Sequence, residues 1–302
     1  MRYLIIGAGA VGGTIGARLG RTGHEVTLVA RGAHLAAIRE RGLTLARPDG
    51  QETVRLPAYD DPRIGEPAGL VCEPDTVVVL AVKSQDTEAA LRTWADVPVR
   101  GGGTLAERLP VLTAQNGVAN ERMALRYVQR VYPVCVWLPA SFLEPGRIAA
   151  EGHPYPGMLQ VGCYPAGGDD TVREIVADFT AAGFVGLARP DVLRWKYAKL
   201  LRNLANGLDA LLGPDGAERS GLVARVGAEG AAVLDRAGIG YASPQEETAE
   251  RGDRVNIRPV AGRARSGSST WQSLARGTGS AETDHLNGEI ALLGRLHGWP
   301  RR

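Results

Sequence analysis

The chain opens with MRYLIIGAGAVGGTIGARLGRTGHEVTLVAR, residues 1–31, and this stretch decides the fold. Residues 3–6 form a short apolar run with β-branched members, which is typical of a buried parallel strand. A glycine turn, a helical pattern and a second strand over residues 25–29 follow. The motif G-x-G-x-x-G at 7–12 therefore stands in a strand–turn–helix–strand unit of about 30 residues, which is the context that a dinucleotide-binding fold requires.

The glycines of this turn have distinct predicted roles. Gly7 permits the tight turn, Gly9 lets the backbone approach a pyrophosphate, and Gly12 lets the helix pack closely on the strand. The phosphates are expected at the positively polarised start of the helix. We therefore predict that a cofactor contacts Gly7, Gly9, Ala10, Val11 and Gly12. The simpler alternative is a tight turn that binds nothing.

The end of the second strand indicates which cofactor binds. Chains that bind NAD usually place Asp or Glu there, because a carboxylate accepts a hydrogen bond from the ribose 2′-hydroxyl. This strand ends Val29-Ala30-Arg31-Gly32 and has no acid. A guanidinium can pair with a 2′-phosphate through two hydrogen bonds, so Arg31 favours NADP. The alternative is that Arg31 is one more surface arginine in an arginine-rich chain.

Two later strands are predicted to end at the same edge of the sheet. The run at 76–82 is the clearest buried strand, and Lys83 follows it; the strand at 111–114 is followed by Gln115 and Asn116. In an open parallel sheet, ligands bind beyond the carboxyl ends of the strands. Lys83 and Asn116 are therefore candidate site residues, although Asn-Gly alone is more often only a turn.

A long helix is predicted over LRWKYAKLLRNLANGLDALL, residues 193–212. At about 100° per residue, it presents an apolar face, a small or charged face, and a third face of lysines and amides. An ordinary surface helix needs only two faces, so the third suggests the wall of a polar cleft. That face contains Lys196, Lys199, Asn203 and Asn206. The alternative is a solvated face that carries two lysines by chance.

Strand patterns nearly vanish after residue 189, so we predict an α/β fold with two domains. Residues 1–189 would form a Rossmann-type doubly wound sheet, and residues 190–302 an all-helical domain.

Two later stretches carry polar groups. Ser269 lies where a loop enters a helix and could hold a carboxylate, although plain helix capping is common. Glu282 begins the last helix and is a second candidate site residue. The alternative is that its carboxylate only interacts favourably with the helix dipole.

Composition excludes several classes of function. The net charge is +2, from 35 basic and 33 acidic residues, so the composition has no large excess of positive charge that would favour binding to nucleic acid or an anionic membrane. No apolar run is long enough to span a bilayer. Three cysteines far apart suggest neither a disulfide framework nor a metal site, and a cytoplasmic setting is the simplest expectation. Homodimerisation is left open.

Six segments together resemble the ketopantoate reductase (2-dehydropantoate 2-reductase) family. They stand in the family's order: GAGAVGG at 7–13, AVKSQD at 81–86, QNG at 115–117, KLLRNLAN at 199–206, SSTWQS at 268–273 and ETDHLNG at 282–288. The resemblance implies a Rossmann domain followed by a helical domain, with the active site between them. It also implies NADPH-dependent reduction of the ketone of a small 2-oxo acid.

The resemblance assigns roles at individual positions. Lys199 matches the catalytic lysine, Asn203 the asparagine one turn later, and Glu282 the acid that bonds the substrate hydroxyl. Ser269 matches the serine near the substrate carboxylate, while Lys83 and Asn116 match residues that face the nicotinamide and substrate. The family's second helix asparagine often stands one position after Asn206, where this chain has Gly207, so the substrate role of Asn206 is an open prediction.

Two other functions stay open from the sequence. The chain could be an NADP-binding sensor without catalysis, since fold alone does not settle function. A sensor would need neither Lys199 nor Glu282, and both are present. The other alternative is a related hydroxy-acid or imine-reducing dehydrogenase that acts on a different substrate.

Overall fold

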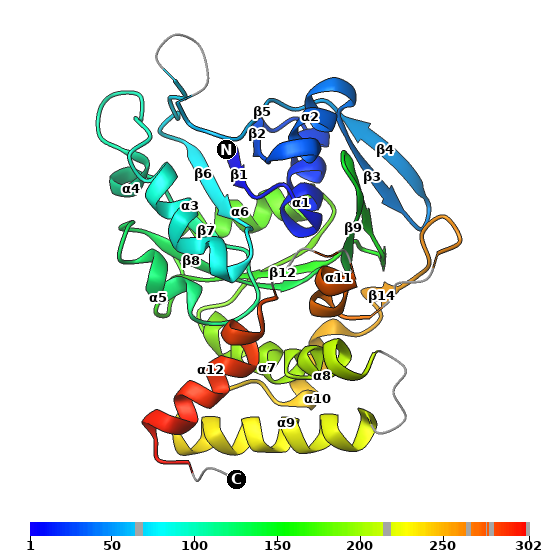
Figure 1. Cartoon of the computed structure of the whole chain (residues 1–302). Helices are drawn as coiled ribbons and strands as arrows, with labels where there is room; N and C mark the ends of the chain where they lie inside the picture. The colour runs from blue at the N-terminus through cyan, green and yellow to red at the C-terminus, as the bar shows by residue number, and fades with distance from the viewer. Residues whose placement is uncertain (64–68, 214–218, 264–266, 276, 278–280, 300–302) are drawn as a thin grey trace. The chain divides into compact units, whose positions relative to one another are not determined.

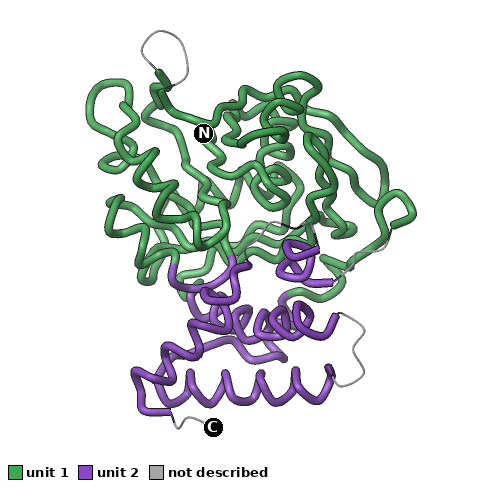
Figure 2. Tube along the Cα trace, in the orientation of Figure 1, with its two compact units in different colours: residues 1–115, 120–192, 251–265 green, residues 116–119, 193–250, 266–302 purple. Residues whose placement is uncertain are grey.

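The computed structural model describes residues 1–63, 69–213, 219–263, 267–275, 277 and 281–299 (Figure 1). It contains two compact units, shown in different colours in Figure 2. Unit 1 comprises residues 1–115, 120–192 and 251–265, and unit 2 comprises residues 116–119, 193–250 and 266–302. The predicted domains 1–189 and 190–302 are each continuous in sequence. In the structure, by contrast, residues 116–119 belong to unit 2 and residues 251–265 belong to unit 1.

The centre of unit 1 is an eight-stranded sheet in the order β13-β12-β8-β7-β6-β1-β2-β5. All neighbours pair in parallel except β12 and β8, which are antiparallel. The bounds are β1 Arg2–Ile6, β2 Val26–Val29, β5 Ala58–Tyr59, β6 Thr76–Leu80, β7 Val111–Thr113, β8 Val131–Trp137, β12 Met158–Val161 and β13 Val185–Ala188. The predicted Rossmann-type sheet is confirmed.

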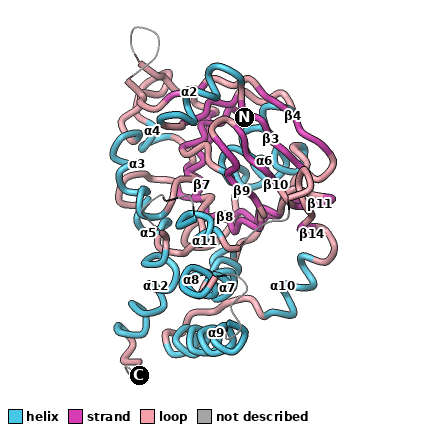
Figure 3. The backbone as a smooth tube through the Cα atoms, turned by 45° about the vertical axis from the view of Figure 1, so that its right-hand side comes forward, coloured by secondary structure: helices cyan, strands magenta, loops and turns pink. Residues whose placement is uncertain are grey.

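Strand β1 shows why the sheet is buried on both faces. Tyr3 and Ile5 belong to one apolar cluster, and Leu4 and Ile6 belong to another, as alternation along a strand requires. The first cluster includes residues of α1 (Ala10–Arg21) and α6 (Asp170–Ala181). The second includes residues of α3 (Thr87–Trp94), α4 (Leu105–Arg108) and α5 (Asn120–Ala124). Helices α3, α4, α5 and α6 can be found beside the strands in Figure 3, and α1 in Figure 1.

Two smaller sheets complete unit 1. One has the order β4-β3-β10-β9, with β3 Leu43–Arg47, β4 Gly50–Val54, β9 Ala140–Glu144 and β10 Arg147–Ala150. The other pairs β11 (Gly152–Pro154) with β14 (Val255–Ile257). Strand β14 is an exception to the all-helical second half, because its backbone pairs with β11 and its segment belongs to unit 1.

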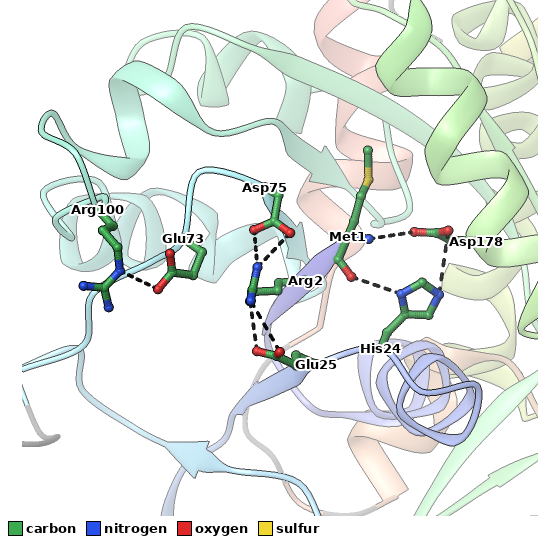
Figure 4. A network of polar contacts seen from close by, with 8 residues as sticks. All are labelled: Met1, Arg2, His24, Glu25, Glu73, Asp75, Arg100 and Asp178. Carbon is green, nitrogen blue, oxygen red and sulfur yellow. Dashed lines mark hydrogen bonds and ion pairs between the residues drawn. The ribbon is translucent and has the colours of Figure 1, made fainter.

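Ion pairs close the edge of the main sheet at the amino ends of its strands (Figure 4). Arg2 at the start of β1 donates to Asp75 at 2.7 Å and to Glu25 at 2.9 Å, so it bridges the turns that precede β6 and β2. Beside it, His24 Nδ1 lies 3.0 Å from the Met1 carbonyl oxygen. This network leaves the opposite edge of the sheet, where the strands end, as the place for a ligand.

Unit 2 is built from helices: the bulk of α7 (Val192–Asn203), then α8 (Ala205–Leu212), α9 (Arg219–Arg236), α10 (Pro244–Arg251), α11 (Ser269–Ala275) and α12 (Thr283–Leu296). Its core includes Leu200, Leu204, Val233, Leu286 and Ile290. The guanidinium of Arg202 donates to the buried carboxylate of Glu247 at 2.7 Å. These six helices confirm the predicted helical part.

The predicted single helix over 193–212 is wrong in one respect, because the structure divides it at Leu204 into α7 and α8. The Leu204 N–H is shared between the carbonyls of Leu200 and Leu201, at 3.2 and 3.4 Å. Asn287 Nδ2 on α12 donates to the Leu204 carbonyl at 3.0 Å. A side chain bonded to a helix carbonyl competes with the regular ladder, which accounts for the break.

Candidate functional site

The glycine turn of unit 1 has the geometry expected of a phosphate-binding loop. Gly7 has φ +103°, and a Cβ atom there would lie 2.8 Å from the Val82 nitrogen. A Cβ on Gly12 would lie 2.2 Å from the Gly7 carbonyl oxygen, so only glycine fits at the start of α1. Gly9 has open space where its Cβ would be, with no atom within 4 Å. Backbone and ligand could therefore approach closely at Gly9.

A cavity of about 300 Å³ lies at this turn, at the carboxyl ends of the strands of unit 1. Gly7 and Gly9 line it, as does Arg31, which directly precedes α2 (Gly32–Arg41). Among the described residues the Arg31 side chain has no hydrogen-bond partner and is exposed. Ala10 and Val11 form the first turn of α1 next to the lining residue Gly9. Of the predicted cofactor residues, Gly7, Gly9 and Arg31 thus line this cavity, whereas Ala10, Val11 and Gly12 are not among its lining residues.

Asp60 and His34 are among the residues of this cavity that sequence reasoning missed. Asp60 follows β5, the neighbour of β2, and brings an acid to the wall that contains Arg31. His34 lies on α2 and touches the glycine turn through a hydrogen bond to Ala8. The pairing of β5 with β2 depends on a long excursion through β3 and β4, so no local pattern placed Asp60 here. His34 stands on α2 only three residues after Arg31, so its closeness in sequence to a predicted cofactor residue is a signal that could have identified it.

A buried polar network supports the turns that follow β6 and β7. Gln115 Nε2 donates to the Val82 carbonyl at 2.9 Å and to Thr87 Oγ1 at 2.7 Å. Thr87 Oγ1 donates to Asn120 Oδ1 at 2.9 Å, and Asn120 Nδ2 donates to Ser84 Oγ at 3.1 Å. These side chains are all nearly inaccessible, so the network fixes the backbone around Lys83, which immediately precedes the short 3₁₀ turn Ser84–Asp86.

Unit 2 brings two predicted site residues into direct contact. Lys199 Nζ on α7 donates to Asn116 Oδ1 at 2.7 Å. One helical turn later, Asn203 Nδ2 is buried and has no hydrogen-bond partner among the described residues. A buried donor without a partner is costly, and it is a ready contact for an acceptor on a ligand. Lys196, by contrast, is only 3% exposed, so the two lysines differ in burial.

The remaining predicted residues lie on the other helices of unit 2. Glu282 precedes α12 and is 5% exposed. Ser269 is the first residue of α11, and the hydroxyl of its neighbour Ser268 accepts the Trp271 N–H at 3.3 Å, so Ser268 provides the helix cap. Asn206 lies on α8 and is partly buried. Gly207 faces Asn287, whose Oδ1 lies 3.0 Å from the position of an added Cβ.

None of the described helices is long and apolar enough to cross a membrane. No group of three or more metal-ligating side chains occurs among residues with described positions.

Comparison with family models covers most of the chain. Residues 3–166 match the model described as ketopantoate reductase PanE/ApbA, and residues 191–301 match its C-terminal counterpart. The 2-dehydropantoate 2-reductase of Pyrococcus horikoshii is 31% identical over 213 residues, 70% of this chain. That match spans 64% of the relative's length. The Halobacterium salinarum 2-dehydropantoate 2-reductase is 29% identical over 98% of this chain and 93% of its own length.

Solved structures agree with these matches. A PanE/ApbA family ketopantoate reductase from Ralstonia eutropha JMP134 is 30% identical, with a TM-score of 0.76 over 99% of this chain and 93% of that protein. A D-mandelate dehydrogenase solved with NADH and anilino(oxo)acetate has a TM-score of 0.81 over 99% and 93%, at 20% identity. At that identity the likeness concerns the fold alone.

Proposed function

Because the chain belongs to the ketopantoate reductase family, we propose that it reduces the ketone of a 2-oxo acid, with ketopantoate as the first candidate and NADPH as the reductant. The observation that supports this most is the hydrogen bond from Lys199 Nζ to Asn116 Oδ1 at 2.7 Å. It holds a flexible cation in one place, one helical turn before Asn203, whose buried amide nitrogen has no hydrogen-bond partner among the described residues.

The residues of unit 1 fit a dinucleotide. NADPH, when bound, supplies the hydride. The open face of Gly9 and the cavity at the start of α1 suit a pyrophosphate, and the Arg31 guanidinium suits a 2′-phosphate. Lys83 would face the nicotinamide from the turn that Gln115, Thr87 and Asn120 hold rigid.

Lys199 is the proposed general acid. Reduction of a ketone leaves negative charge on the carbonyl oxygen, and a positioned ammonium stabilises that charge more in the transition state than in the ground state. Lys199 then transfers a proton from Nζ to this oxygen. Asn116 accepts one hydrogen bond from the same Nζ and so restricts where the other protons point.

The other polar residues would bind substrate. Glu282 would accept a hydrogen bond from the product hydroxyl, and Ser269 would donate one to the substrate carboxylate. Asn203 Nδ2 is a buried donor that no group in the described part of the chain accepts from, and an oxygen of the substrate would satisfy it. Asn206 is the further candidate contact on α8.

The cellular setting is part of the same proposal. All three cysteines are free, and burial raises the pKa of the Cys72 thiol to about 11. Such a thiol is unreactive and suits the reducing conditions of the cytoplasm.

The test is NADPH oxidation against a panel of 2-oxo acids that includes ketopantoate, pyruvate and phenyl-substituted 2-oxoacetate. We expect turnover with at least one of them, and ketopantoate to give the highest kcat/KM. Binding of NADP⁺ without oxidation of NADPH by any member of the panel would instead indicate a sensor. If another 2-oxo acid gave the highest kcat/KM, the proposed reaction would stand, but ketopantoate would no longer be the first candidate substrate.

A further inference from the structure

His34 joins the glycine turn to a distant hairpin of unit 1. It lies on α2, and its Nε2 is 2.7 Å from the Ala8 carbonyl oxygen. Its Nδ1 is 2.9 Å from the Gly146 backbone nitrogen, in the turn between β9 and β10. The Gly146 carbonyl in turn accepts the Thr44 N–H at 2.8 Å, so this hairpin turn is itself held by β3.

The two partners of the imidazole determine its protonation. A backbone N–H can only donate and a backbone carbonyl can only accept. Nδ1 must therefore be the acceptor for Gly146, and Nε2 must hold the hydrogen that is donated to Ala8. Only the neutral imidazole with its hydrogen on Nε2 satisfies both. Burial also lowers the pKa of His34 below its ordinary value, and the Phe142 ring packs edge-on at 5.0 Å.

The glycine turn depends on this contact for its orientation. Both the Gly7 and Ala8 N–H groups donate to the Val29 carbonyl, at 3.2 and 2.8 Å, and the Ala8 carbonyl points to His34. Because a peptide group is planar and trans, the direction of the Ala8 carbonyl also fixes the Gly9 N–H. That N–H donates to no group in the described part of the chain, and Gly9 lines the cavity.

We propose that His34 is a positioning residue for the cofactor's pyrophosphate: it holds the Ala8–Gly9 peptide so that the Gly9 N–H is available to a phosphate oxygen. This inference rests on the proposed function, since it requires a nicotinamide dinucleotide. His34 also lines the cavity, but the role proposed for it is exerted through the turn and requires no contact with the cofactor. Its removal should therefore weaken cofactor binding without changing the chemical step.

The test compares NADP⁺ binding by titration calorimetry in the full chain and three variants. We expect His34→Ala to bind roughly tenfold more weakly or worse, since two buried hydrogen bonds are lost. His34→Gln offers both an amide donor and a carbonyl acceptor, and should recover most of the affinity. The matched control is His24→Ala, which removes another histidine bonded to a backbone carbonyl, at the opposite edge of the sheet (Figure 4).

Kinetics separate positioning from general damage. His34→Ala should raise the KM for NADPH by the same factor as the dissociation constant and leave kcat at saturation within about twofold of the wild type. Unchanged NADP⁺ affinity in His34→Ala, or failure of His34→Gln to recover affinity, would overturn the role of His34. If the wild-type chain bound no nicotinamide dinucleotide, the proposed function itself would be wrong.

Discussion

Two lysines of α7 differ in their surroundings, and this difference separates their predicted roles. Lys199 Nζ is bonded to Asn116, whereas the Lys196 side chain is 3% exposed. We expect Lys199→Ala to lower kcat by about 10²–10⁴, the range for a positioned acid, while NADP⁺ affinity is kept. Lys196→Ala should keep most of its turnover per folded molecule but melt at a lower temperature. If steady-state assays gave the reverse ranking, the assignment of Lys199 as the catalytic lysine would be wrong.

Arg31 and Asp60 line the same cavity and have opposite charges, so they should affect cofactor choice in opposite directions. Arg31→Ala should raise the KM for NADPH about tenfold and that for NADH less, because only NADPH has the 2′-phosphate. Asp60→Asn should lower the KM for NADPH, since it removes a like charge near that phosphate. The KM ratio of the two cofactors in each variant is the measurement. Equal KM values in the wild type would contradict the NADP preference.

His34 also makes stability depend on pH. Its pKa in the folded chain lies below the unfolded value of 6.5, chiefly because burial disfavours the charged ring. As pH falls below 6.5 the unfolded chain takes up a proton that the folded chain resists, so the free energy of unfolding decreases until the folded pKa is reached. Urea unfolding from about pH 8 to about pH 5 should show this decrease in the wild type, and less of it in His34→Gln. Parallel curves for the two proteins would contradict it.

At the scale of single residues, the sequence was sufficient to predict those site residues whose neighbours in the site are also close along the chain. Gly7, Gly9, Gly12 and Arg31 belong to one βα unit, and their spacing alone places them together. Asp60 and the contact of His34 with Gly146 depend on strand pairings that are remote in sequence, so no local pattern gave them. The contact of Lys199 with Asn116 likewise joins residues 83 positions apart.

Helix α1 offers a matched pair of glycine substitutions that separate folding from binding. Gly12→Ala places a Cβ 2.2 Å from the backbone oxygen of Gly7, which cannot move without displacing the turn. We expect it to lower the free energy of unfolding by about 2 kcal/mol or more. Gly9→Ala meets no atom within 4 Å and has φ −72°, so it should fold normally and yet bind NADP⁺ more weakly. Chemical denaturation and calorimetry on both variants measure this; strong binding by Gly9→Ala would show that the cofactor does not approach there.

Elements were predicted well where their pattern is local and less well where tertiary contacts decide. The buried strand β6 follows directly from the apolar run at residues 76–82. The helix over 193–212 has an unbroken helical pattern, but the side chain of Asn287, remote in sequence, bonds to its backbone at Leu204 and divides it. Strand β14 is only three residues long and exists through its pairing with β11.

For the whole molecule, the two units divide the proposed chemistry. Every residue that lines the glycine-turn cavity belongs to unit 1. Lys199, Asn203, Ser269 and Glu282 belong to unit 2, together with the short segment 116–119 that carries Asn116. Cofactor binding and proton transfer should therefore be separable by mutation, even though a complete reaction requires both.

Ligand-induced stabilisation tests this separation on the full chain. A ligand that binds only the folded state adds RT ln(1 + [L]/Kd), or about 2.7 kcal/mol at a concentration of 100 times Kd. NADP⁺ should therefore raise the melting temperature of wild type and Lys199→Ala by the same amount, because the cavity of unit 1 is intact in both. Gly9→Ala should show a smaller rise at the same NADP⁺ concentration, although its melting temperature without ligand is unchanged. If Lys199→Ala lost the stabilisation instead, cofactor binding would depend on unit 2, and the division of roles between the units would be wrong.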